Sequence, residues 1–174
     1  LDKLQGQVEQ TTQISARYGV NTGEMLVQPR LLGCDPSVET GQRHYSERIL
    51  GHKFRISSPS FFQVNTRQAE VVVGLIKEAL CLSKDDVIVD AYAGVGTFAA
   101  LLADDVSKVV AIEESAAAIG DAELNMEGIS NVELRCGRTE EILRDLSIDQ
   151  SINGVILDPS RKGCLPGTLE ALIQ

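Results

Sequence analysis

The sequence predicts an α/β fold in which a parallel sheet, covered by helices on both faces, follows a smaller β-rich segment. From residue 65 onward, short apolar strand patterns alternate with helix-spaced patterns. One strand pattern, residues 87–91, runs into a Gly-x-Gly turn that opens a helix. Residues 11–64 carry turn signals and alternating strands instead. Strands that alternate with helices in this way predict right-handed βαβ units and a parallel sheet.

The β-rich segment is expected to contain a hairpin and a further strand. Residues 13–18 and 24–29 flank Asn21–Gly23, which is a good turn signal. Residues 53–57 alternate as a half-buried strand does. We therefore expect one domain boundary, between a β-rich segment at 1–64 and an α/β domain at 65–174.

The α/β part has elements of regular spacing. Apolar residues at helical intervals predict a helix over Thr66–Leu82, with Asn65 or Thr66 as its cap. The remaining expected strands and helices are listed together: strands Val87–Ala91, Lys108–Ile112, Val132–Arg135 and Gly154–Leu157; helices Thr97–Ala103, Ser115–Gly128, Thr139–Leu146 and Gly167–Ile173.

Composition excludes several classes of protein. The 174 residues are 43% apolar, which is ordinary for a globular chain, and no apolar stretch has the length of a membrane span. The four cysteines lie far apart without a Cys-x-x-Cys pair, which argues against a zinc site or a disulfide scaffold. Free thiols fit a reducing cytoplasm. The chain starts at Leu1 and ends at Gln174 inside an expected helix, so we expect a piece of a longer protein.

Charge is distributed unevenly along the chain. The net charge is −9, of which residues 1–64 contribute +1 and the rest −10. This balance argues against a chain that wraps nucleic acid by itself. The first interpretation is a solvated acidic surface on the α/β part. The alternative is a polyanion-facing edge formed by Arg43, His44, Arg48, His52, Lys53 and Arg55.

Polar residues follow the ends of the predicted strands. They are Asp90, Tyr92, Gly94 and Gly96 after the first, Glu113 after the second, Gly137–Thr139 after the third and Asp158–Gly163 after the fourth. Ligands of open parallel sheets bind beyond the carboxyl ends of the strands, at the switch point of the topology. The sequence therefore predicts a site at this edge of the sheet.

The glycine turn favours one ligand over another. Gly94–Ala99 matches the Gly-x-Gly-x-x-Gly/Ala fingerprint of dinucleotide sites, which alone is a weak signal. Asp90 stands just upstream, where its carboxylate would repel a pyrophosphate. It suits a ligand with an ammonium and a sulfonium, as S-adenosylmethionine has. Glu113, 23 residues after Asp90, suits the ribose of either ligand.

Three motifs in order carry a resemblance to a known family. They are Phe61–Asn65 (Phe-Phe-Gln-Val-Asn), Asp90–Phe98 and Asp158–Gly163 (Asp-Pro-Ser-Arg-Lys-Gly). The chain resembles the RNA 5-methyluridine methyltransferases, which methylate C5 of uridine in transfer or ribosomal RNA. The resemblance implies a Rossmann-like S-adenosylmethionine methyltransferase sheet, here incomplete, behind part of a central β-rich domain.

The resemblance also implies roles for individual residues. Gln63 and Tyr92 are expected to contact the cofactor, Glu113 to bind its ribose, and Asp158 to lie between cofactor and target base. The expected cofactor set is Gln63, Tyr92, Thr97, Glu113, Asp158, Asp90, Gly94 and Gly96; the expected substrate set is Asp158 and Arg161, and no metal is expected. From the residues alone, Arg161 is either an ion-pair partner or a group that faces phosphate or the base.

Catalysis in the resembled family needs a cysteine that adds to C6 of uracil and a base that removes the C5 proton. Both lie downstream of the Asp-Pro-x-Arg motif in that family, beyond the end of this chain, and Cys164 is not in the nucleophile's position. We therefore expect no catalytic residue in this chain, inactivity of the chain alone, and RNA as the partner of the full-length protein. A dinucleotide-binding oxidoreductase module, a methyltransferase with another substrate, and a binding fragment without chemistry stay as alternatives.

Overall fold

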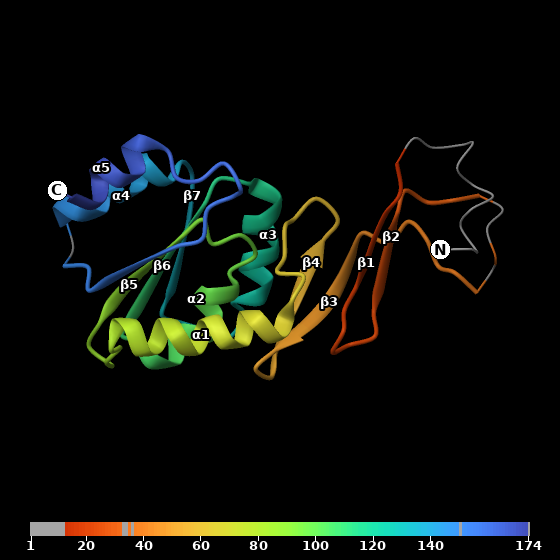
Figure 1. The fold of residues 1–174 in the computed structure, drawn as a ribbon, viewed down its shortest axis with the longest axis horizontal. Helices are drawn as coiled ribbons and strands as arrows, with labels where there is room; N and C mark the ends of the chain where they lie inside the picture. The colour runs from red at the N-terminus through yellow and green to blue at the C-terminus, as the bar shows by residue number, and fades with distance from the viewer. Residues whose placement is uncertain (1–12, 33–34, 36, 150, 174) are drawn as a thin grey trace.

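A computed structural model describes residues 13–32, 35, 37–149 and 151–173, and it has the predicted α/β architecture (Figure 1). Small antiparallel strand pairs occupy the N-terminal part, and a parallel four-stranded sheet with helices on both faces follows. Within the described residues, no helix is both long enough and apolar enough to cross a membrane.

The N-terminal part consists of two hairpins. The expected first hairpin is confirmed: β1 (Ser15–Tyr18) pairs antiparallel with β2 (Met25–Gln28). The expected strand at 53–57 is β4 (His52–Ser57), and its partner β3 (His44–Ile49) was not predicted. The β3 sequence is mostly polar, which hides a strand that nevertheless buries four of its six side chains.

Part of the charged edge suggested as an alternative for polyanions makes contacts within the fold, while Arg43, His44 and Arg48 are exposed. Arg55 forms an ion pair with Asp121, and Lys53 lies 3.3 Å from a Glu24 oxygen. The His52 ring nitrogen Nε2 lies 3.0 Å from the backbone oxygen of Asn125. These side chains hold the hairpins to each other and to the α/β part.

The parallel sheet places the predicted strand ends side by side. Its strands are β5 (Val87–Ala91), β6 (Lys108–Glu113), β7 (Val132–Cys136) and β8 (Gly154–Leu157). Their order is β7-β6-β5-β8, so β5 pairs with both β6 and β8. The chain direction across the sheet therefore reverses at β5, and the carboxyl ends of β5, β6 and β8 form one edge.

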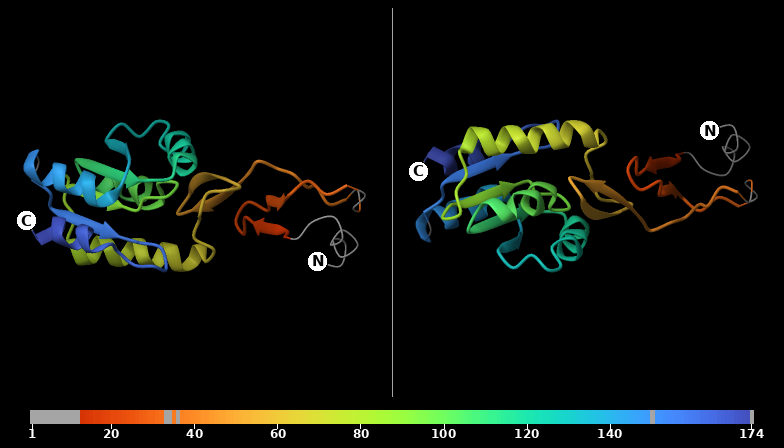
Figure 2. Two further views of the ribbon diagram at one scale, coloured as in Figure 1. Left: turned by 90° about the horizontal axis from the view of Figure 1, so that it is seen from above. Right: turned by 90° about the horizontal axis from the view of Figure 1, so that it is seen from below.

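Helices cover the two faces of the sheet in separate groups. One group contains α1 (Thr66–Leu80) and α2 (Thr97–Leu102), which pack on Ile88, Val109 and Ala111. The other contains α4 (Thr139–Asp149) and α5 (Pro166–Ile173), which pack on Val89 and Val110. Figure 1 shows α1 on the side of the sheet away from α4 and α5, and Figure 2 shows the same elements from above and from below. A short 3₁₀ helix, Ala103–Asp105, follows α2 directly.

Side-chain caps and backbone conformation determine where the helices begin and end. Asn65 caps α1, as predicted, because its side-chain oxygen accepts from the Gln68 amide. The helix ends two residues earlier than expected because Cys81 adopts a left-handed conformation. Ser115 caps α3 (Ala116–Asn125), which lies beside β4.

One apolar cluster joins the second hairpin to the α/β part. Phe54 and Ile56 of β4 pack together with Phe62, Val95 and Met126. The cluster therefore crosses the boundary expected at residue 65, and it holds the segment 61–64 next to the glycine turn.

Asp90 lies inside this fold, within β5. It is fully buried; its Oδ2 accepts from the Ala99 amide at 2.9 Å, and within the described chain its Oδ1 has no partner. Desolvation by burial raises the pKa of Asp90 to about 7, helped by the nearby charges of Asp158 and Glu113 and opposed by the Ala99 amide.

In the glycine turn between β5 and α2, a side chain at one of the two glycines would meet a neighbouring side chain. Gly96 has φ +81°, and a Cβ there would lie 2.6 Å from the Met126 methyl carbon. Gly94 has φ +58° but open space around the same position. Both glycines need their backbone freedom, and a side chain at Gly96 would in addition displace the flexible end of Met126.

We predict that Gly96→Ala destabilises the fold more than Gly94→Ala. Each substitution places a side chain in the left-handed region, which costs about 1–2 kcal/mol. Gly96→Ala also makes the Met126 methyl group move, and because this group is the flexible end of a side chain the added cost is at most about 1 kcal/mol. Urea unfolding of both variants measures the difference. Equal losses would contradict the close approach of Met126.

We predict that the stability contribution of Asp90 declines between about pH 4 and about pH 7. Its pKa is about 7 when folded and near 3.8 when unfolded, so the folded state binds the proton more tightly. The contribution is complete below the unfolded value, and it is lost as pH rises through the folded value. The free energy of unfolding relative to Asp90→Asn therefore falls by a few kcal/mol over this range, measured by urea unfolding. If the free energy of unfolding depends on pH in the same way in both proteins, the raised pKa of Asp90 is contradicted.

Candidate functional site

A cavity of about 790 Å³ opens at the carboxyl ends of β5, β6 and β8. Seven of the residues expected at the site line it: Gln63, Tyr92, Gly94, Thr97, Glu113, Asp158 and Arg161. Asp90 and Gly96 do not line it, and neither does the segment 137–139 that follows β7. The remaining lining residues are Phe61, Phe62, Val64, Ala93, Val95, Phe98, Pro159, Ser160 and Lys162.

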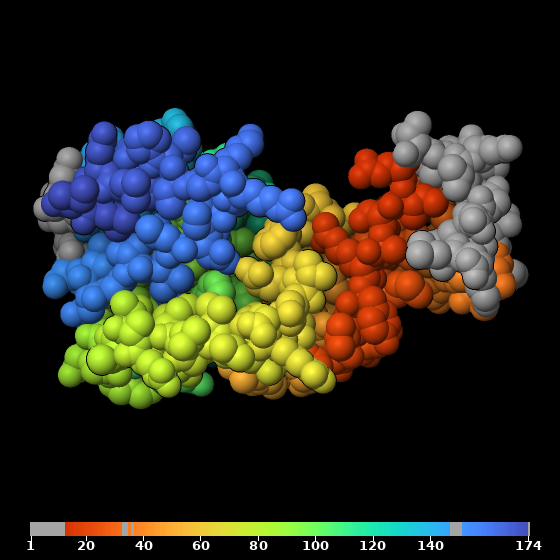
Figure 3. All heavy atoms as spheres, viewed as in Figure 1, coloured from red at the N-terminus to blue at the C-terminus, as the bar shows by residue number. Residues whose placement is uncertain are grey.

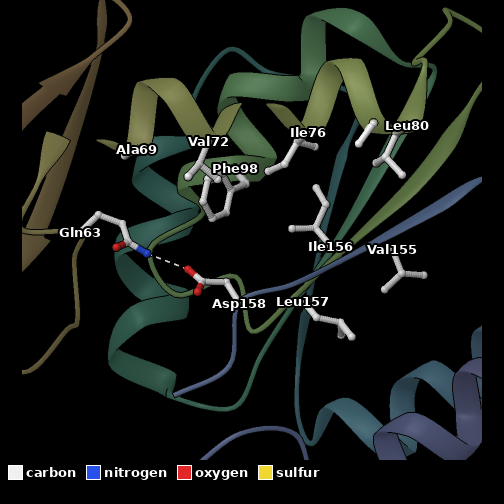
Figure 4. A pocket seen from close by; sticks show the side chains of 11 residues that line it. Gln63, Ala69, Val72, Ile76, Leu80, Phe98, Val155, Ile156, Leu157 and Asp158 are labelled. Atoms are coloured by element: carbon white, nitrogen blue, oxygen red, sulfur yellow. Dashed lines mark hydrogen bonds between the residues drawn. The ribbon is translucent and has the colours of Figure 1, made fainter. Parts of the chain in front are cut away.

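Gln63 and Asp158 meet at the mouth of this cavity. The Gln63 amide donates to Asp158 Oδ2 at 2.6 Å, although the residues lie 95 positions apart. The segment that follows β8, blue in Figure 3, touches the yellow segment that leads into α1. Figure 4 shows the same contact as a dashed line between the two side chains. The bond joins the motif at 61–65 to the motif at 158–163.

Glu113 ties neighbouring turns together from the end of β6. One carboxylate oxygen accepts from the Gly94 amide at 2.8 Å, and the other accepts from the Ser115 amide at 2.7 Å. Each carboxylate oxygen has a further lone pair, so the group can still accept from hydroxyls in the cavity. The end of β6 therefore offers two acceptors beside the glycine turn.

Tyr92 and Thr97 flank the glycine turn. Tyr92 has φ +68°, in the region that L residues rarely adopt, and its hydroxyl lies 3.0 Å from Thr168 Oγ1 of α5. This conformation places its half-buried ring on the cavity wall. Thr97 is buried at the first residue of α2.

Asp90 and Gly96 lie behind the residues that line the cavity and contact the elements around the glycine turn. The Asp90 carboxylate holds the first turn of α2 through the Ala99 amide. Gly96 packs against Met126 and Ala122 of the α3 region. Both residues shape the glycine turn, and neither presents a side chain to the cavity.

Phe61 and Lys162 also line the cavity but were not singled out from the sequence. Phe61 is 69% exposed, which is unusual for phenylalanine, and Lys162 is exposed beside Arg161. Their positions within the motifs at 61–65 and 158–163 are the signal that would have found them.

The charges of the cavity have a clear arrangement. Asp90, Glu113 and Asp158 are close enough that the last two raise the pKa of the first. Arg161 and Lys162 stand exposed on the same cavity. Within the described residues there is no group of three or more metal-ligating side chains. The Glu113 and Asp158 carboxylates favour a cationic ligand in the cavity, and the exposed cations favour an anionic ligand beside the loop after β8.

A second cavity of about 440 Å³ adjoins the first and shares Gln63, Phe98 and Asp158 with it. Its walls are apolar side chains of α1, such as Val72 and Ile76, and of β8 (Figure 4). The Gln63–Asp158 hydrogen bond therefore lies where the two cavities meet.

Relatives with similar sequences are RNA methyltransferases by name. An uncharacterized RNA methyltransferase of Thermosynechococcus vestitus is 36% identical over 147 residues, which are 83% of this chain and 32% of the relative. One of Oceanobacillus iheyensis is 37% identical over 148 residues, again 32% of the relative. The chain thus spans about a third of the length of these curated relatives.

A solved structure has a similar fold over almost the whole chain. The tRNA (uracil-54, C5)-methyltransferase of Pyrococcus abyssi, in complex with S-adenosyl-L-homocysteine, matches with a TM-score of 0.72 and 23% identity. The match covers 98% of this chain and 53% of that one. It confirms the Rossmann-like methyltransferase fold that the resemblance implied.

The family model described as tRNA (uracil-5-)-methyltransferase matches residues 45–172, which include the second hairpin, the glycine turn and the loop after β8. This family uses S-adenosylmethionine as its methyl donor. The resemblance in the three motifs is confirmed, and this chain belongs to the tRNA (uracil-5-)-methyltransferase family.

Proposed function

We propose that this chain is the methyl-donor-binding part of an enzyme that methylates C5 of uridine in tRNA or rRNA. The observation that carries the proposal is the meeting of Gln63 and Asp158 over a cavity that Glu113 and the glycine turn also line. These groups come from all three motifs of the family. We further propose residues 65–174 as the donor-binding domain and residues 1–64 as part of a central domain.

The cavity fits S-adenosylmethionine in size and charge. Its volume lies within the range of about 300–1,000 Å³ found for small-molecule sites. Glu113 offers acceptors for ribose hydroxyls, while Phe98 and Val95 supply apolar surface for a purine. A ligand with an ammonium and a sulfonium would relieve the repulsion among the neighbouring carboxylates. When bound, this donor supplies an electrophilic methyl group.

The mouth of the cavity suits a nucleotide. Exposed Phe61 offers an aromatic face on which an unstacked base can lie. Arg161 and Lys162 offer cations for the adjacent phosphates. We propose that Asp158 stands between base and cofactor, held there by Gln63.

The proposed chemistry begins with a cysteine thiolate that adds to C6 of uracil and leaves C5 nucleophilic. C5 then takes the methyl group, a base removes the C5 proton, and the thiolate leaves. We propose that the cysteine and the base come from parts of the enzyme outside these 174 residues.

The free thiols of Cys81, Cys136 and Cys164 support a reducing compartment such as the cytoplasm.

We predict that Glu113→Ala weakens binding of S-adenosylhomocysteine by at least about tenfold, because charge-assisted hydrogen bonds to ribose are lost. Isothermal titration calorimetry on the chain measures the affinity. Glu114→Ala is the matched control, since Glu114 is exposed and does not line the cavity. Tight binding of NADH with none of S-adenosylhomocysteine would instead favour the oxidoreductase alternative.

We predict that the enzyme containing this chain releases tritium from RNA labelled at uridine C5, in step with methyl incorporation. The C5 hydrogen must leave for C5 to keep a methyl group, so tritium in water measures this step. Asp158→Ala should slow it by about a hundredfold because the target base is then no longer held against the cofactor, whereas Asp145→Ala, an exposed substitution on α4, should not. The chain alone should release none. Methyl incorporation without tritium release would show that another atom is methylated.

A further inference from the structure

We propose that Asp121 and Asn125 of α3 are positioning residues that hold two walls of the cavity in register. One wall is the segment 61–64, and the other is the part of the glycine turn formed by Gly94 and Val95. Both side chains are buried, and neither lines the cavity. The inference rests on the proposed function of the cavity, since it concerns how that cavity is held.

Asp121 holds the turn that leads into the first wall. Its Oδ2 accepts from the Ser57 amide at 2.8 Å, from the Ser57 hydroxyl at 2.6 Å and from the Ser60 hydroxyl at 2.6 Å. Its Oδ1 accepts from the Arg55 guanidinium. A carboxylate that collects this many donors fixes the backbone from Arg55 to Ser60, and Phe61 follows directly.

Asn125 connects the same strand to the second wall. It lies one helical turn after Asp121, on the same face of α3. Its side-chain oxygen accepts from the Arg55 amide at 2.8 Å, and its Nδ2 donates to the carbonyl oxygens of Arg55 and Val95 at 3.1 and 3.0 Å. Val95 is the central residue of the glycine turn. The distance between the two walls is thus set by one helix face.

The turn at 57–60 is also held from its other side. The Arg17 guanidinium of β1 donates to the Ser60 carbonyl oxygen. The first hairpin and α3 therefore both form hydrogen bonds to the turn at 57–60. These bonds restrict the motion of the segment 61–64 that follows the turn. A fixed wall keeps Gln63 within hydrogen-bonding distance of Asp158.

The test uses the chain with Phe61→Trp, because the sequence has no tryptophan and the new side chain reports on the wall alone. In this background, Asp121→Ala should increase acrylamide quenching of Trp emission and weaken the binding of S-adenosylhomocysteine about tenfold, because a wall that moves no longer positions the groups that contact the ligand. Asp121→Asn keeps one accepting oxygen and should recover most of both effects.

Leu146→Ala is the control for general destabilisation, since Leu146 is buried on the opposite face of the sheet. It should lower the unfolding temperature and, well below that temperature, leave both the quenching and the affinity unchanged. The proposal is overturned if Asp121→Ala changes neither readout, or if Leu146→Ala changes both equally. Failure of the unsubstituted chain to bind S-adenosylhomocysteine overturns the proposed function instead, and the quenching still tests the wall.

Discussion

The site depends on the two hydrogen bonds that the Glu113 carboxylate accepts. They join the glycine turn after β5 to the turn after β6, which would otherwise be independent. The glycine turn passes over the end of β6, where the Ala93 amide donates to the Ile112 carbonyl and the Gly94 amide to Glu113. The second Glu113 oxygen meanwhile holds Ser115, which caps α3. One side chain thus fixes the glycine turn relative to α3, and it keeps lone pairs for a ligand.

The same helix then reaches the other side of the cavity. α3 starts beside Glu113, runs past the glycine turn, and presents Asp121 and Asn125 to the second hairpin. The site is therefore assembled around a helix that contributes no lining residue within the described chain. This explains why the second hairpin and the α/β part share one apolar cluster. The shape of the cavity depends on that shared packing as much as on the strand ends.

The sequence predicted the sheet well because strands buried on both faces read as apolar runs. Val87–Ala91 and Gly154–Leu157 have the expected limits. It missed β3, whose polar residues are buried through hydrogen bonds such as those of Glu47 with the Val20 and Asn21 amides. Strand alternation places Asp90 on the Ile88 face, beneath α2, so this periodicity was the available signal that Asp90 points into the core. The Gln63–Asp158 contact was beyond sequence reasoning, because it depends on β8 pairing with β5.

The proposed function places two opposite demands on the charges of the site. A sulfonium donor favours carboxylates nearby, whereas an RNA substrate brings phosphates that carboxylates repel. The charged groups of the site differ in how deeply they are buried. Glu113 is half-buried in the cavity with the fully buried Asp90 behind it, whereas Arg161 and Lys162 are exposed and outnumber Asp158, the one exposed carboxylate among the described residues that line the cavity. Coulomb interactions weaken with distance and with solvent screening, so a phosphate at the rim is governed mainly by the exposed cations. A chain of net charge −9 can in this way accept a polyanion locally, provided that the contact is confined to the mouth of the cavity.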